Sequence, residues 1–117
     1  MVDESAWQEG ARLFEAGKYW ECHEALEGGW LAAEGTEKEF LSGVILLAAA
    51  LHKARAMNSP RGGRRNYAKA LARLAVVPDR YAQIDIRELE ARVHRALRDP
   101  AYRPLLPVVN AEEAHHS

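Results

Sequence analysis

The sequence predicts an all-α fold, a compact bundle of about five helices around an apolar third helix. Apolar side chains recur at helical spacing along most of the chain, whereas strand signals are nearly absent. Three pairs of residues also have the capping-box spacing that satisfies the first free amides of a helix. These pairs are Ser5 with Gln8, Thr36 with Glu39, and Asp85 with Glu88.

A tight turn is expected between the first two helices. Gly17, in "EAGKYWE", suits the left-handed position that ends a helix, so the second helix should begin at Lys18 or Tyr19. This helix carries one apolar stripe, which a rotation of about 100° per residue brings together. Its members are Tyr19, Cys22, Leu26, Trp30 and Ala33.

The third predicted helix, residues 37–57, is apolar nearly all round, which is typical of a central element that others cover on most sides. Ser42, Gly43 and a run of alanines would let neighbouring backbones approach closely. The stretch 58–63, "NSPRGG", should break the helix through its proline and glycines.

A fourth helix should follow the break, with Tyr67, Ala70, Leu71 and Leu74 facing inward. Residues 77–85 are expected to form a loop and residues 86–98 a fifth helix. We predict one helical domain over 1–107 and a flexible C-terminal tail over 108–117, in which His115 and His116 are read as solvated tail or tag residues.

Composition excludes some classes of protein. With 117 residues, about half of them apolar, the chain suits one compact domain. Cys22 is the only cysteine, so the chain can form no internal disulfide. The longest apolar stretch, residues 44–51, is far too short to span a bilayer. A cytoplasmic protein without a membrane segment is therefore the expectation.

Charge is segregated along the chain although the net charge is only −1. Residues 1–39 hold ten acids and three bases, whereas residues 40–78 hold seven bases and no acid. An acidic first part could pack on a basic middle within one chain or between two, so a homo-oligomer is one expectation.

The basic stretch supports a second hypothesis, binding of a phosphate or an RNA backbone. Tyr67 is the only aromatic residue within this basic row, and it should point inward, where it could not stack on a base. Nucleic acid is therefore the less favoured partner, and a row of solvated side chains is the simpler interpretation. The row consists of Arg61, Arg64, Arg65, Lys69 and Arg73.

The segment "YWECHEALEGGW", residues 19–30, is the most unusual in the chain because it sets a histidine and glutamates among large aromatic side chains. Trp30 lies near the middle of the apolar stripe and should be core, whereas Trp20 lies off it and is the better candidate for a pocket wall. Cys22 is expected to be a small core residue.

Two segments, "FEAGKYWECHEALEGGW" and "FLSGVILLAAALHKA", resemble the signature of the family catalogued as domain of unknown function 309. The resemblance covers roughly residues 7–74 and implies a short all-helical protein of bacteria or archaea. It brings no settled activity, although the family has been labelled a predicted metal-dependent hydrolase.

The chemistry behind such a label can be stated. His23 and Glu27, four residues apart, share one helical face and could bind a divalent metal ion, with His52 or Glu24 as a further ligand. In the hydrolase hypothesis His23, Glu27 and His52 are the metal ligands and Glu24 is the base. The run "HEALE" lacks the second histidine of the HExxH motif.

A structural interpretation needs no metal. A histidine at the edge of a core can donate one ring proton to a carboxylate one turn away, which satisfies both polar groups. Glu27 would then orient His23, and His52 would make an analogous contact from the third helix. The residues leave both interpretations open, as well as the question of whether the protein is an enzyme.

Overall fold

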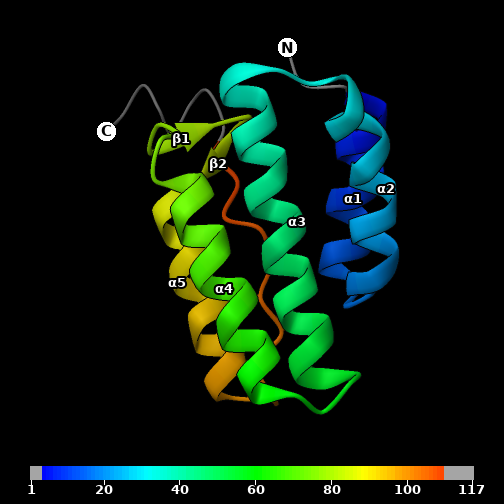
Figure 1. Cartoon of the computed structure of the whole chain (residues 1–117), viewed down its shortest axis with the longest axis vertical. Coiled ribbons are helices and arrows are strands. Elements are labelled where there is room, and N and C mark those ends of the chain that lie inside the picture. Colours follow the sequence, from blue (N-terminus) through cyan, green and yellow to red (C-terminus); the bar gives the residue numbers. More distant parts are fainter. Residues whose placement is uncertain (1–3, 110–117) are drawn as a thin grey trace.

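The computed structural model describes residues 4–109. This part of the chain holds five helices and one short hairpin, which confirms the predicted all-α bundle (Figure 1). The elements are α1 (Glu4–Glu15), α2 (Tyr19–Ala32), α3 (Gly35–Arg55), α4 (Pro60–Leu74), β1 (Arg80–Tyr81), β2 (Ile84–Asp85) and α5 (Ile86–Arg98).

α3 lies at the centre, flanked by α2 on one side and α4 on the other (Figure 1). α1 packs on α2, and α5 packs on α3 and α4. Each of the five helices contributes fully or almost fully buried apolar side chains to one core, among them Phe14, Leu26, Leu47, Leu74 and Leu89. The expectation of an apolar central third helix is confirmed.

A glycine sets the close contact between α3 and α4. A Cβ atom built on Gly43 would lie 2.3 Å from Cδ2 of Leu74, a separation that real atoms do not adopt. The predicted close approach of backbones near Ser42 and Gly43 therefore occurs, and the neighbour is α4.

Three predicted helix starts are wrong. The chain is already helical at Glu4, so Ser5 lies inside α1 and is not its N-cap. α3 begins at Gly35 after an N-cap at Glu34, so Thr36 lies inside its first turn and caps nothing. The predicted break after the third helix occurs, at residues 56–59, but the glycines of "NSPRGG" are not part of it, because α4 already starts at Pro60. Ser59 is the N-cap and accepts a hydrogen bond from the Gly62 amide at 3.1 Å. A serine followed by proline is a favourable helix start, and it outweighs the low propensity of two glycines.

The predicted loop 77–85 contains an antiparallel hairpin. Ala82 and Gln83 connect its strands with φ values of 52° and 62°, the left-handed conformation that a tight two-residue turn needs. The C-terminal segment returns to this hairpin, where the Val109 amide donates to the Gln83 carbonyl at 2.7 Å and Val108 pairs with Ile84. Pairing thus continues two residues past the predicted boundary at 107, and residues 110–117, with His115 and His116, lie outside the described residues.

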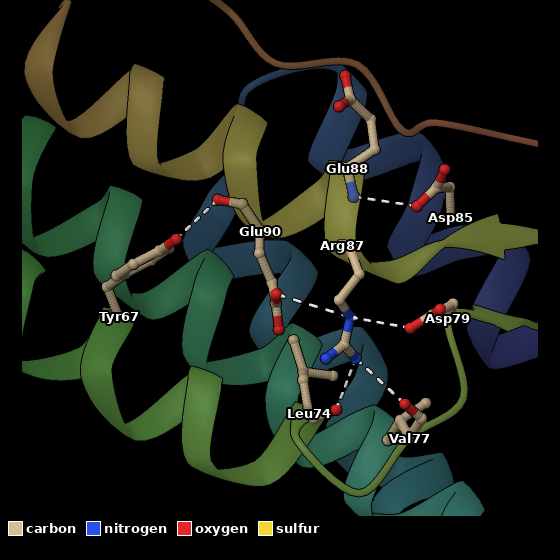
Figure 2. A network of polar contacts seen from close by, with 8 residues as sticks. All are labelled: Tyr67, Leu74, Val77, Asp79, Asp85, Arg87, Glu88 and Glu90. Atoms are coloured by element: carbon tan, nitrogen blue, oxygen red, sulfur yellow. Dashed lines mark hydrogen bonds and ion pairs between the residues drawn. The ribbon is translucent and has the colours of Figure 1, made fainter.

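Arg87 of α5 joins three parts of the fold (Figure 2). Its Nη2 donates to the carbonyl oxygens of Leu74, at 2.7 Å, and Val77, at 3.1 Å, just where α4 ends. Its Nε lies 3.7 Å from carboxylate oxygens of both Asp79 and Glu90. One guanidinium therefore satisfies carbonyls at the end of α4 and holds the following loop against α5.

Within residues 4–109, no helix combines the length and the apolar character needed to cross a bilayer.

Candidate functional site

The turn between α1 and α2 fixes the start of the segment singled out above. Gly17 has a φ of 77°, and the amides of Gly17 and Lys18 donate to the carbonyls of Phe14, at 3.0 Å, and Leu13, at 2.9 Å. These bonds end α1 in the left-handed manner that the sequence predicts. They also place Lys18 as the N-cap of α2, so that Tyr19 and Trp20 stand in its first turn.

Trp20 contacts both predicted histidines. Its ring stacks on His23 at 4.9 Å between centroids and 17° between planes, and it meets His52 of α3 at 5.3 Å and 39°. The structure thus brings residues of α2 and α3 together around one indole, which remains 47% exposed. A pocket wall was the prediction for Trp20, and its ring does line a cavity.

His23 and Glu27 lie on one face of α2, as the four-residue spacing requires. Nε2 of His23 is 3.8 Å from Oε1 of Glu27, which is too long for a hydrogen bond, and the two side chains are 21% and 52% exposed. Nδ1 of His23 is buried and has no hydrogen-bond partner in the protein. The carboxylate therefore does not orient the imidazole as tightly as the structural interpretation expects.

A three-ligand metal site is not assembled. Among residues 4–109, no group of three or more His, Cys, Asp or Glu side chains is placed to hold a metal ion. Glu24, the predicted base, is exposed and does not line the cavity beside Trp20. His23, Glu27 and His52 do not fit a metal ion as a ready set of ligands, and metal binding by them stays a prediction.

A cavity of about 400 Å³ opens next to Trp20, between the start of α2, the end of α3 and the C-terminal segment. The polar and aromatic residues that line it come from three regions far apart in the sequence. They include Lys18, Tyr19, Trp20, His52, Arg55 and Arg103.

Two buried donors at this cavity have no protein partner. The Tyr19 hydroxyl is buried and unbonded in a residue only 5% exposed, and Nε of Arg55 is likewise buried and unbonded. Nη2 of the same Arg55 guanidinium does have partners. It donates to the carbonyls of Ala96, Asp99 and Tyr102, where α5 ends. Buried donors are normally satisfied, so this pair is the most unusual polar feature of the site.

The charges around the cavity favour an anion. Lys18, Arg55 and Arg103 line it, whereas Glu21 is the acid among its lining residues. Burial raises the pKa of Tyr19, and the two arginines oppose this rise only in part. The Tyr19 hydroxyl therefore keeps its proton at neutral pH and acts as a donor.

Arg55 and Arg103 are the residues that sequence reasoning missed. Arg55 lies one helical turn after His52 on α3, so helical spacing could have predicted that both side chains lie on the same face. Arg103 had no such signal, because it reaches the site only through the return of the C-terminal segment. A Cβ on Gly17 would lie 3.7 Å from its Nε, which shows how closely Arg103 covers the turn between α1 and α2.

Cys22 and the basic row need no part in the site. Burial raises the pKa of Cys22 to about 12, so the thiol is a buried core group, as predicted, and not a nucleophile at neutral pH. In the basic row, Nη1 of Arg73 lies 3.2 Å from Oε1 of Glu39. Anion or RNA binding by the row Arg61 to Arg73 stays a prediction.

The fold and the site together define a small helical domain with a basic, aromatic cavity at one end of its bundle. The sequence pattern of the family described as Domain of unknown function (DUF309) matches residues 7–66, just over half of the chain. The protein belongs to this family, which confirms the resemblance noted in the two signature segments.

A solved structure extends the likeness beyond the family segment. The chain is similar to the conserved hypothetical protein TTHA0068 from Thermus thermophilus, with 46% identity and a TM-score of 0.72. The similarity covers 83% of this chain and 98% of that one. No curated protein matches this chain.

Proposed function

We propose that this protein binds a small anionic ligand that carries a planar group, in the cavity formed by Tyr19, Trp20, Arg55 and Arg103. One observation carries the proposal. The Tyr19 hydroxyl and Nε of Arg55 are both buried, both lack a protein partner, and both belong to residues that line this cavity. A ligand oxygen that reached either donor would satisfy a polar group that otherwise lowers the stability of the fold.

The surroundings favour a negative charge on that oxygen. Lys18 and Arg103 add two cationic side chains, and charge-assisted hydrogen bonds are stronger than neutral ones. The first turn of α2, from Tyr19 to Glu21, also lines the cavity, so the positive end of the helix dipole adds to the same field.

The shape favours a flat group beside the anion. A volume of about 400 Å³ is in the range of small-molecule sites. The indole of Trp20 contacts His23 and His52 but keeps 47% of its surface exposed, and a ring can stack on the exposed part. A phosphate or carboxylate attached to an aromatic ring has both features. The proposal therefore concerns a binding protein for such molecules and assigns no reaction.

Isothermal titration with three probes tests the proposal. Phenyl phosphate should bind, inorganic phosphate should bind more weakly because it lacks the ring, and phenol should not bind measurably because it lacks the charge. Binding of phenyl phosphate should also change the fluorescence of Trp20, in a way that Trp20→Phe removes.

Three variants locate the binding. Tyr19→Phe and Arg103→Ala should each weaken phenyl phosphate binding by about 10-fold, the loss expected for one hydrogen bond or ion contact to a charged group. Lys69→Ala is the matched control, since it removes an exposed base that does not line this cavity. Equal binding by all three variants would place the ligand elsewhere, and no binding of either phosphate at millimolar concentration would reject the proposal.

A further inference from the structure

The central helix is left uncovered on one face. The sequence of α3 is apolar nearly all round, yet Ile45, Leu46 and Ala49 are only partly buried between α2 and α4. Figure 1 shows α3 in the middle of the view, between α2 and α4. A groove of about 220 Å³ runs there, with Ile45 and Leu46 in its lining, Glu27 from α2 on one side and Arg73 from α4 on the other.

The two walls of the groove carry opposite charges. The α2 wall has Glu24 and Glu27, both exposed, and α2 contains no lysine or arginine. The α4 wall has Lys69 and Arg73, both exposed, and α4 contains no acid, although Nη1 of Arg73 also lies 3.2 Å from Oε1 of Glu39 on α3. The apolar floor thus lies between one acidic and one basic wall.

The charges on the two walls are in register. Short connections make α2 and α4 each antiparallel to α3, so α2 and α4 run parallel to one another. Trp30 of α2 donates to Ser42 of α3, and the next residue, Gly43, lies against Leu74 of α4. Glu27 and Arg73, which line the same groove, therefore lie at similar levels. Glu24 precedes Glu27 by about one turn, and Lys69 precedes Arg73 by about one turn in the same direction.

One exposed apolar side chain follows the charged pair on each wall of the groove. Leu31 follows Glu27 by one turn and is 73% exposed, and Val76 follows Arg73 by three residues and is 67% exposed. They are the two most exposed of the large apolar side chains noted in the described part of the chain. Helical spacing puts Leu31 on the same side of α2 as Glu27, and Val76 lies in the turn directly after α4.

We propose that a second copy of this chain covers this face, related by a two-fold axis parallel to α3. Rotation about that axis preserves level and exchanges the two walls, so the α2 of each copy lies over the α4 of the other. Glu24 then faces Lys69 of the second copy, Glu27 faces Arg73, and Leu31 faces Val76. A two-fold axis across α3 would instead put acids over acids, which is repulsive.

The face is large enough for such a dimer. The molecule measures 40 × 32 × 25 Å along its principal axes. A stable interface needs about 800 Å² from each partner, an area that a face of a molecule of these dimensions can supply. The arrangement would have an apolar centre at Ile45, Leu46 and Ala49 with charged residues around it, as specific interfaces have. This inference does not depend on the ligand proposed for the cavity.

Sedimentation equilibrium over a range of concentrations tests the dimer. The wild-type chain should reach about twice its 13.1 kDa mass. Glu24→Lys/Glu27→Lys makes both walls basic and Lys69→Glu/Arg73→Glu makes both acidic, so each double variant alone should dissociate at least ~10-fold more readily, because like charges meet. An equal mixture of the two variants should form a heterodimer, since every wall then faces its opposite.

Arg61→Glu/Arg64→Glu is the matched control, with the same charge change on other faces of α4, and it should leave the dimer intact. Circular dichroism checks that each variant is folded, and Leu31→Ser/Val76→Ser weakens the same face without adding charge. A wild-type chain that stays monomeric at all concentrations overturns the proposal, whatever other molecule covers the groove. A dimer that all these variants leave unchanged also overturns it, because its interface lies elsewhere.

Discussion

Tyr19 combines a buried aromatic ring with a hydroxyl that no protein group accepts. Its ring packs edge-on against Phe14 at 5.5 Å, a contact that phenylalanine would keep. Tyr19→Phe removes only the unsatisfied polar atom, so we expect it to raise the free energy of unfolding by about 1 kcal/mol, or the melting temperature by about 4 °C. Thermal denaturation without ligand measures this.

Tyr67→Phe is the control for that prediction. The Tyr67 hydroxyl donates to the Glu90 carbonyl at 2.9 Å, so its loss should lower the melting temperature. A Tyr19→Phe variant that is less stable than wild type would show that the hydroxyl does have a partner. A more stable variant with weaker phenyl phosphate binding would show that Tyr19 is kept for function at the expense of stability.

Glu90 should make the stability depend on pH. Burial raises the pKa of its carboxyl, and Arg87 opposes this only in part. A carboxyl whose pKa rises on folding favours the folded state while protonated and loses that contribution as the pH rises through its folded pKa. Glu90→Gln should therefore raise the melting temperature at pH 7, with a difference from wild type that shrinks below about pH 4, where both folded and unfolded wild type are protonated.

Glu88→Gln is the control for this pH series, because Glu88 is exposed and its Oε2 lies 2.9 Å from Nε of Arg92. Its loss should change the melting temperature little. A Glu90→Gln variant that is less stable than wild type at pH 7 would show that the contact with Arg87 outweighs the burial.

The metal hypothesis makes a separate prediction for His23, Glu27 and His52. It requires one zinc or manganese ion per chain in protein purified without a histidine tag, lost in His23→Ala and in Glu27→Ala, because each variant removes a ligand. Metal analysis after gel filtration measures this, and His94→Ala is the control outside the cluster. A wild-type chain with no stoichiometric metal after either ion is supplied would end the hypothesis.

At the scale of elements, the contact between α3 and α4 depends on Gly43. An added methyl group would meet Leu74 at 2.3 Å, so Gly43→Ala should lower the free energy of unfolding by about 2 kcal/mol through overpacking. Gly28→Ala is the matched control, because nothing lies within 4 Å of a Cβ there, and a better helix former should stabilise α2 slightly. Chemical denaturation of both variants measures the contrast, and equal stability would show that the two helices separate easily.

Local signals predicted α5 best and α4 least well. Asp85 accepts from the Glu88 amide at 3.0 Å, so α5 starts where the capping box places it. The start of α4 could not be predicted in the same way, because its signals conflict. Two glycines indicate a break, whereas Ser59 and Pro60 indicate a helix start, and the helix does start at Pro60. The hairpin was missed since its turn residues, Ala82 and Gln83, are not the glycine or asparagine that usually mark such turns.

At the scale of the whole molecule, the helical periodicity of apolar residues predicted the bundle, but it predicted only part of the candidate site. Trp20, His23 and His52 meet because helical spacing within α2 and α3 decides their directions. The role of Arg103 could not be predicted from the sequence. Its position depends on the path of the chain after α5, and no local sequence pattern determines that path. The cytoplasmic location and the boundary of the domain at 107 stay predictions.

The double attachment of Arg55 has a consequence for the far end of the chain. Its Nη2 donates to the carbonyls that end α5, while its Nε is buried and has no protein partner, in a residue that lines the cavity. A ligand that binds Nε would therefore also restrict the motion of the guanidinium group, to which the backbone carbonyls of Asp99 and Tyr102 are hydrogen-bonded. Amide hydrogen exchange in that segment should slow when phenyl phosphate is bound, and stay unchanged in the same experiment with phenol.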